Sequence, residues 1–250
     1  MAFGLNQKRE WLVAHYNDAL PEDKVDSLNQ LLKRLQNGEP LAYITGKRSF
    51  FGLDFKVTPD VLVPRSETEL LVEEAVTWLE ANPGRHKLVD VGTGSGIIAI
   101  SLADRFADLQ VTAIDVSAPA LQIASENAIS NGLTERINWR QNDLLSGIED
   151  QYDLITANLP YIPTLTLQGL PILKHEPRLA LDGGESGLDL IDRLLGQAVN
   201  CLKPRGLILL EIEASQGQSA PELAKKYFPQ ARIECLNDYA DLPRVVRIQI

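Results

Sequence analysis

The spacing of apolar and polar residues divides the chain into three parts. Residues 1–45 place their apolar positions at helical intervals, with a break at 18–23. Residues 46–63 alternate in the manner of strands, and Gly52 lies where a turn is needed. Residues 64–250 alternate between strand-like and helical stretches. The pattern therefore predicts a small helical N-terminal domain, a β-hairpin connector and a large α/β domain.

The large domain begins with a predicted amphipathic helix that opens after Pro64, with Ser66 and Glu69 at the spacing of a capping box. Strand-like runs follow at 88–91, 110–114, 136–140, 153–157 and 207–212. Helical stretches separate most of them, near 97–106, 118–130 and 187–202. This alternation predicts a mostly parallel sheet with helices on both faces. Two β-rich runs near the C-terminus, 232–236 and 245–250, have a short polar link and predict an antiparallel closing strand.

Composition and charge narrow the functional classes. The chain has 250 residues, a hydrophobic content of 44% and a net charge of −10. This charge argues against general affinity for nucleic-acid phosphates, so no stable nucleic-acid partner is expected. No apolar run approaches the roughly 20 residues that span a bilayer, and the first residues lack the apolar core of a signal peptide. We therefore expect a soluble, cytoplasmic monomer without membrane contact.

Cysteine, histidine and clustered acidic residues give no sign of a metal site. Cys201 and Cys235 are not at metal-ligand spacing, so free thiols in a reducing compartment are expected. The three histidines are far apart in the sequence, which favours surface or capping roles. The acidic residues of 182–192 are expected to form a solvated loop and the start of a helix.

A glycine-rich loop after the run 88–91 gives the first indication of chemistry. In Gly92-Thr93-Gly94-Ser95-Gly96 the glycines permit a tight turn and a close approach of the backbone to a ligand at a helix N-terminus. A dinucleotide fingerprint needs its third glycine one residue later, and the Lys-Ser/Thr ending of a Walker loop is missing. The loop favours a nucleoside without a pyrophosphate, and a structural glycine turn is the alternative.

Polar residues also follow the next two strand-like runs. A carboxylate at Asp115 can accept hydrogen bonds from both hydroxyls of a ribose, or it can cap the helix 118–130. After the third run, an adenine can rest against Leu144 with Asp143 near its amine. Loops that follow parallel strands open on one edge of a sheet, so we expect these residues to lie together.

The tetrapeptide Asn158-Leu159-Pro160-Tyr161, which follows the run 153–157, is suited to hold a planar –NH2 group. The Asn158 side-chain oxygen and the Leu159 carbonyl can each accept one N–H, which aims the nitrogen lone pair without a strong base. Tyr161 can pack against the planar group and exclude water. Asn and Pro are also common turn residues, so a plain loop is the alternative. With the glycine loop, the tetrapeptide predicts methyl transfer from S-adenosylmethionine to a planar nitrogen.

Further segments along nearly the whole chain carry a resemblance to a known family. They are Gly38–Gly46, Phe51-Gly52, Val63–Glu69, Glu176–Leu181, Leu209–Ile212 and Gln216-Gly217, besides the glycine loop and the tetrapeptide. By these segments the chain resembles the HemK/PrmC-type release factor N5-glutamine methyltransferases, which are class I methyltransferases. The Asn-Pro-Pro-Tyr signature alone is shared with DNA adenine methyltransferases, whereas Pro-Arg-x-Glu-Thr-Glu ahead of the glycine loop is more specific.

The resemblance implies a Rossmann-like fold with a mostly parallel seven-stranded sheet and a helical N-terminal domain that docks the substrate. It implies that Gly92–Gly96, Asp115, Asp143, Leu144 and Asn158 hold S-adenosylmethionine. The tetrapeptide would present the glutamine of the Gly-Gly-Gln motif of class I peptide chain release factors. The implied reaction is methyl transfer to the side-chain amide nitrogen of that glutamine, with no metal.

The sequence departs from the family pattern at three places. Leu159 stands where the family has the first Pro of Asn-Pro-Pro-Tyr, and because only its carbonyl is needed, activity is expected to survive with a looser loop. Ser66 replaces a Pro at a helix start, a small loss that capping offsets in part. One or two helices expected at the start of the N-terminal domain are missing, so a shortened docking domain is expected.

Two other functions remain as alternatives. One is methylation of another planar nitrogen, in a ribosomal-protein glutamine or a nucleic-acid base. Net acidity disfavours the base, and the segment Glu67-Thr68-Glu69 favours a release factor by analogy. The other is a nucleoside-binding module without catalysis, against which the intact Asn158 and Tyr161 argue.

Overall fold

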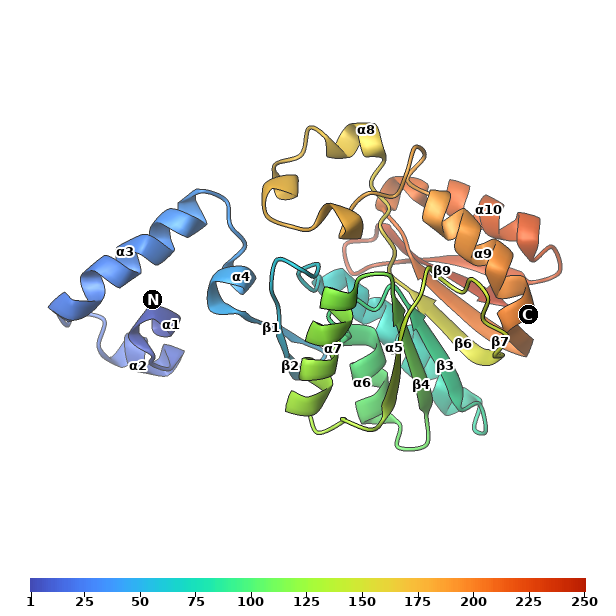
Figure 1. Cartoon of the computed structure of the whole chain (residues 1–250), viewed down its shortest axis with the longest axis horizontal. Coiled ribbons are helices and arrows are strands. Elements are labelled where there is room, and N and C mark those ends of the chain that lie inside the picture. Colours follow the sequence, from blue (N-terminus) through green and yellow to red (C-terminus); the bar gives the residue numbers. More distant parts are fainter.

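Four helices occupy the N-terminal part of the chain in the computed structural model, which describes all 250 residues. They are α1 (Ala2–Leu5), α2 (Arg9–Ala14), α3 (Glu22–Gln36) and α4 (Leu41–Thr45). Gly4 lies where α1 contacts α3, because a Cβ there would overlap with the buried Leu28 side chain. Asn6, in the left-handed region, separates α1 from α2, a break that the sequence pattern did not predict. Figure 1 shows α1–α3 apart from the rest of the molecule.

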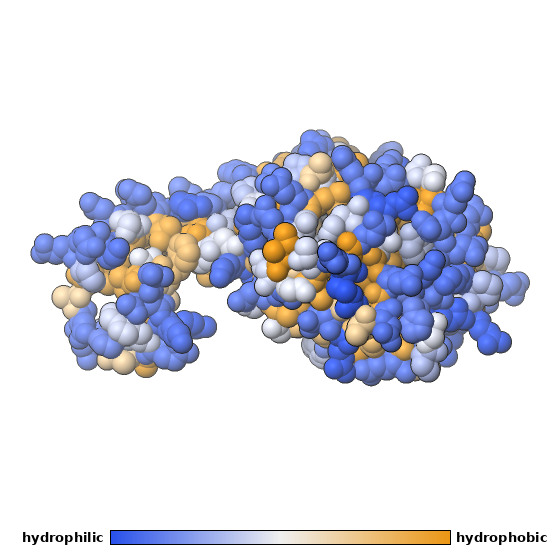
Figure 2. Space-filling view, turned by 60° about the horizontal axis from the view of Figure 1, so that its bottom comes forward, coloured by the Kyte–Doolittle hydropathy of each residue, from blue (hydrophilic) through white to orange (hydrophobic).

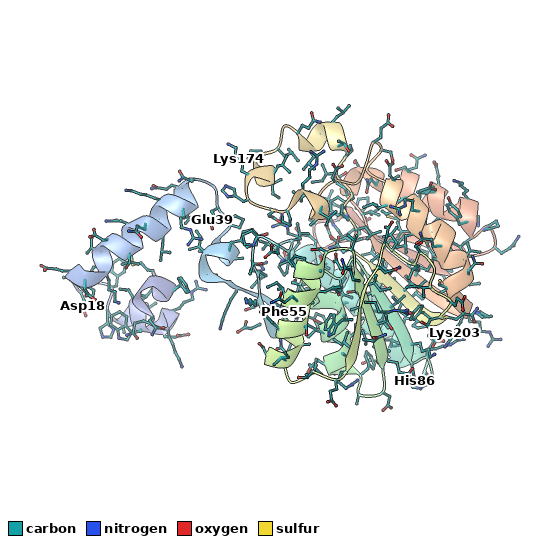
Figure 3. All side chains as sticks on the ribbon, in the orientation of Figure 1. Asp18, Glu39, Phe55, His86, Lys174 and Lys203 are labelled. Carbon is teal, nitrogen blue, oxygen red and sulfur yellow. The ribbon has the colours of Figure 1, made fainter.

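A two-stranded antiparallel hairpin connects these helices to the large part of the chain. Its strands are β1 (Lys47–Phe50) and β2 (Leu53–Lys56). Phe51 and Gly52 both have positive φ, 48° and 81°, as a two-residue type I′ hairpin turn requires. Phe55 is fully buried where the hairpin packs on the large part (Figure 3). The Asn127 side chain bonds both the amide and the carbonyl of Lys56, at 2.6 and 3.0 Å, and so fixes the hairpin.

Seven strands form the central sheet, in the order β5-β4-β3-β6-β7-β9-β8. Their bounds are β3 (Lys87–Val91), β4 (Gln110–Asp115), β5 (Ile137–Gln141), β6 (Tyr152–Ala157), β7 (Leu202–Glu211), β8 (Arg232–Asn237) and β9 (Pro243–Gln249). The first five pair in parallel, and β9 is antiparallel to both β7 and β8. The predicted mostly parallel sheet with an antiparallel end is confirmed.

Helices cover both faces of the sheet (Figure 1). One face packs on α5 (Glu69–Ala81), α6 (Ile97–Arg105) and α7 (Ala118–Ser130), and the other on α9 (Asp189–Cys201) and α10 (Ser219–Tyr227). Short α8 (Thr164–Leu167) and two 3₁₀ turns lie in the long loop after β6. His86 and Lys203, next to the amino ends of β3 and β7, lie at the opposite end of the sheet from Lys174 of that loop (Figure 3). None of the helices is long and apolar enough to cross a membrane.

The predicted capping box at the start of α5 is wrong. Residues Ser66–Thr68 form a 3₁₀ turn, and α5 begins at Glu69 with no side-chain cap. The Glu69 carboxylate instead accepts the backbone amide of Phe51 at 2.9 Å. This acid therefore links the hairpin turn to α5, and nothing at Ser66 offsets the loss of a proline.

Candidate active site

A cavity of about 440 Å³ opens at the carboxyl ends of β3, β4 and β6. Every site residue predicted from the sequence lines it, except Gly96 and Tyr161. Further parts of the wall come from residues between 59 and 68, from the first turns of α6 and α7, from the loop after β6 and from Arg193 of α9. Its volume lies within the range of small-molecule sites. No group of three or more His, Cys, Asp or Glu side chains is arranged to hold a metal ion.

The glycine loop is held rigidly on its inner side and is open toward the cavity. The amides of Gly92 and Thr93 donate to one carbonyl at the end of β4, at 2.8 and 2.9 Å. Gly92 has a φ of 73°, and a Cβ there would lie 2.8 Å from Cδ2 of Leu159. Gly94 has a φ of 56° and no atom within 4 Å of an added Cβ. The space beside its Cα is therefore open to a ligand, while its amide is bonded to Asp115. Gly96 instead permits close packing of α6 against α7.

Asp90 supports this loop from below, a role that sequence reasoning missed. Its carboxylate is 1% exposed and accepts hydrogen bonds from the hydroxyls of Thr93 at 2.7 Å and Thr156 at 2.9 Å. Burial raises the pKa of Asp90 to about 6, although these hydroxyls favour the charged form. The buried acid thus joins the glycine loop to β6.

Asp115 places a carboxylate at the carboxyl end of β4. Its oxygens accept the backbone amides of Gly94 at 2.8 Å and Ser117 at 2.9 Å. Burial raises the pKa of Asp115, and these amide bonds offset the shift only in part. The cap of α7 is the Ser117 side chain, which accepts the Ala120 amide, so Asp115 does not serve as that cap. A carboxylate beside an open glycine backbone fits the hydroxyls of a ribose.

The loop after β5 adds an apolar surface to the cavity. Leu144 is 7% exposed and has a φ of 51°, a strained conformation for a leucine. The Asn142 side chain holds this turn by donating to the carbonyls of Leu144 and Ser146, each at 3.0 Å. Asp143 lies at the rim, where its carboxylate accepts from Arg193 at 2.6 Å and is about half exposed. Leu144 is suited to pack against a planar base.

The tetrapeptide after β6 presents two free acceptors at the same cavity. The Asn158 Nδ2 donates to Oγ1 of the fully buried Thr68 at 3.2 Å, which directs the amide oxygen away from Thr68. The carbonyl of Leu159 accepts no hydrogen bond from the rest of the chain. Its side chain is buried against Gly92. Pro160 completes this stretch of the wall.

Tyr161 lies behind the wall. Its carbonyl accepts the Gln216 side chain at 3.1 Å, and a Cβ on Gly183 would come within 2.7 Å of its Cα. Burial, with a smaller contribution from the charge of Glu211, raises the pKa of the Tyr161 hydroxyl to about 12. Its packing against a substrate stays a prediction.

The acidic segment 182–192 makes several hydrogen bonds within the loop after β6. Asp182 accepts the Thr164 hydroxyl at 2.6 Å and the Arg178 guanidinium at 2.9 Å, and Asp189 accepts the Glu185 amide at 2.7 Å. The predicted start of a helix is confirmed, because α9 begins at Asp189. The acids of the loop lie at exposed or intermediate positions, as expected of a solvated loop, and Gly183 of the same segment packs against Tyr161.

Two more buried acids shape the wall. Glu176, 4% exposed, accepts Arg65 at 2.6 Å and the amide of Val63 at 3.3 Å, so the loop after β6 is joined to the segment before α5. Glu211, 1% exposed, ends β7 next to Asn158. Both lie in segments quoted for the family resemblance, and Glu211 also carried a signal in the sequence as an acid within a mainly apolar run.

Two family models and several curated relatives match the sequence of this chain. Residues 1–46 match the family described as PrmC N-terminal domain, and residues 66–168 match the one described as Methyltransferase small domain. The chain is 42% identical to a release factor glutamine methyltransferase of Moorella thermoacetica, over 94% of this chain and 84% of that protein. A release factor glutamine methyltransferase of Koribacter versatilis is 39% identical, over 98% and 87%.

A solved structure agrees with the fold. The ribosomal protein L11 methylase of Lactobacillus delbrueckii subsp. bulgaricus superposes with a TM-score of 0.55 at 21% identity, over 77% of this chain and 82% of that one. At this identity the likeness concerns the methyltransferase fold alone.

Proposed function

The chain belongs to the family of release factor glutamine methyltransferases, and from this membership we propose that it methylates the Gly-Gly-Gln glutamine of class I peptide chain release factors. The methyl donor is S-adenosylmethionine, and the acceptor is the side-chain amide nitrogen. One observation of the site supports the proposal most directly. Two acceptors, the Asn158 amide oxygen and the Leu159 carbonyl, share a cavity with the glycine loop and Asp115.

The residues of the cavity fit a nucleoside cofactor. Asp115 would bind the ribose hydroxyls, Leu144 would pack against the adenine, and the open backbone at Gly94 would allow close approach. S-adenosylmethionine, when bound, supplies an electrophilic methyl group. Asp143 would contribute at the rim, where it is already paired with Arg193. The chain therefore offers one recognition group for each part of the nucleoside.

The tetrapeptide would act on the glutamine by position and polarity. An amide nitrogen is a poor nucleophile because its lone pair is delocalised into the carbonyl. Acceptance of one N–H by Asn158 and of the other by the Leu159 carbonyl would orient the nitrogen and favour its pyramidal form. Such positioning, with acceptors aimed at the developing positive charge, accelerates transfer without a strong base, because the methylated nitrogen is acidic enough to lose one proton to solvent.

The N-terminal helices are suited to hold the protein substrate, which we propose as their role. Figure 2 shows hydrophobic residues gathered on this region. Its exposed apolar side chains are Met1, Phe3, Val13, Tyr16, Leu20, Val25, Leu32, Leu35 and Leu41. Apolar residues exposed together commonly mark a protein contact. A translation factor as substrate also supports a cytoplasmic location, and we propose that the enzyme acts there as a monomer.

Mass spectrometry of a class I release factor after incubation with the enzyme and S-adenosylmethionine tests this function. We expect one methyl group, on the glutamine of the Gly-Gly-Gln peptide. A release factor with alanine in place of that glutamine is the matched control and should gain none. Methyl transfer to the control, or an unmodified release factor beside an enzyme that binds the donor in calorimetry, would contradict the proposed substrate.

A further inference from the structure

Glu211 is a buried acid for which the proposed chemistry has no use. It follows Leu210, which pairs with Ala157 of β6 in parallel register, so Glu211 and Asn158 leave neighbouring strands at the same level. The residue is 1% exposed, and its Oε2 has no hydrogen-bond partner. An unpaired buried carboxyl oxygen is costly, which implies a benefit elsewhere.

Thr68 faces both this acid and Asn158. Its hydroxyl oxygen accepts Nδ2 of Asn158 at 3.2 Å, so its own proton must be donated to a different group. The neighbouring Glu211 carboxyl is the available acceptor, and the Thr68 hydroxyl favours its charged form. A hydrogen bond from Thr68 to Glu211 would make proton donation run in one direction, from Asn158 to Thr68 and from Thr68 to Glu211, and the Asn158 side chain also favours the charged form of this acid.

We propose that Glu211 is a positioning residue which, through the Thr68 hydroxyl, holds the Asn158 amide with its oxygen toward the cavity. With the amide reversed, Nδ2 would face the substrate –NH2, and two donors cannot bond. The inference rests on the proposed function, since the polarity matters only for a substrate that donates N–H. Glu211 itself does not touch the substrate.

The charge on Glu211 determines the direction of this chain of bonds. A carboxylate only accepts, whereas a protonated Glu211 can donate to Thr68, and Thr68 can then donate to Asn158 Oδ1 and favour the reversed amide. The facing groups are Thr68 and Glu67 from the turn before α5, Asn158 and Tyr161 after β6, and Arg244 from β9. Burial raises the pKa of Glu211 to about 7, with repulsion from Glu67 adding to it and Arg244 opposing it. Activity should therefore fall as pH decreases through neutrality.

Steady-state kinetics with release factor test the role of the charge. We expect Glu211→Gln to lower kcat by about 10-fold or more and to remove the acid limb of its pH profile, with donor affinity unchanged. Thr68→Val should have a similar effect, and Thr68→Ser, which keeps the hydroxyl, should retain wild-type activity. In a double mutant the two losses should not add, because they break one chain of bonds.

Two matched variants control for unspecific effects. Ser101→Ala deletes another buried hydroxyl, one without a partner in α6, and Glu234→Gln makes the same isosteric change on the half-exposed face of β8. Both should leave kcat unchanged. A Glu211→Gln enzyme with wild-type kcat and an intact acid limb would overturn the proposal. If that variant does not fold, wild-type activity of Thr68→Val would overturn it equally.

Nuclear magnetic resonance of the side-chain amide of Asn158 gives a test that needs no substrate. Its –NH2 signals, assigned by their loss in Asn158→Asp, should titrate near pH 7 in the wild type and not in Glu211→Gln. Signals that do not change with pH would refute the coupling between Glu211 and Asn158, even in an active enzyme. Coupled signals in an enzyme that leaves release factor unmodified would instead support the coupling and reject the proposed substrate.

Discussion

Replacement of Glu211 by glutamine should stabilise the protein at alkaline pH. The pKa of this acid rises from an ordinary value of 4.5 to about 7 in the folded protein, because burial disfavours its charged form. Between these two values the folded protein keeps a proton that the unfolded chain has lost. The free energy of unfolding of the wild type therefore falls as pH rises through this window.

The size of the effect follows from the shift in pKa. The difference between a pKa of 4.5 and one of about 7 corresponds to about 3 kcal/mol when Glu211 is fully charged. Between pH 5.5 and pH 8, the part that develops is about 2 kcal/mol. Glutamine carries no titrating proton, so its curve should lack this decline. Asp90, whose pKa is raised to about 6, is present in both proteins and cancels from the difference.

Urea unfolding followed by circular dichroism between pH 5.5 and pH 8 measures this difference. The range stays above the isoelectric point of about 4.8, near which low net charge promotes association. The two proteins are compared by the slope of the free energy of unfolding against pH, because any misfit of the new amide changes that free energy by the same amount at every pH. Parallel curves for the wild type and Glu211→Gln would refute a raised pKa at this site. A stabler but slower variant would show that the active site is maintained at a cost in stability.

Three further outcomes follow from the structure. Gly92→Ala should lower the free energy of unfolding by about 2 to 4 kcal/mol in urea titrations, since it adds a clash at 2.8 Å to backbone strain. Gly147 also has a positive φ but has open space around it, so Gly147→Ala should lower this free energy less, and equal losses would refute the clash. By calorimetry, Asp115→Ala should weaken donor binding about 10-fold or more, whereas Asn158→Ala should keep the affinity and lose kcat; equal losses of affinity would contradict the separate roles. Asp153→Asn should destabilise the fold by about 3 kcal/mol, because two cations are paired with this buried carboxylate at the far end of the sheet, and should leave kcat at saturation unchanged; a large fall in kcat would refute that separation.

The fold could be predicted because apolar periodicity reports burial directly. The antiparallel end was predictable too, since the polar link between β8 and β9 is too short for a crossover. The positions at which strands begin and end were predicted less well. The strand β7 begins at Leu202, earlier than expected, because Lys203, Pro204 and Arg205 hide its apolar pattern. A bulge in its pairing with β6 accommodates these residues.

The part of the site that follows parallel strands was also predictable, since those loops meet at one edge of the sheet. The supporting groups were not. Thr68 and Asn158 are 90 positions apart, and their contact depends on where α5 packs on the sheet. The side-chain cap at Ser66 failed for a related reason, because Glu69 found a partner in the hairpin turn. Such pairings belong to tertiary packing and leave no local periodicity.

The arrangement of buried acids explains how an acceptor-only site can be held in place. Asp90 orders the glycine loop, Glu176 holds the segment at Arg65, and Glu211 lies behind the tetrapeptide. Each accepts hydrogen bonds or pairs with a cation on the side of the wall that faces away from the cavity. The Asn158 amide oxygen and the Leu159 carbonyl therefore remain free on the cavity side. Amide methylation needs such oxygens, because a general base would have to compete for a proton that an amide holds tightly. The polarity of the site is thus set by residues that never reach the substrate, and its rigidity depends on their burial.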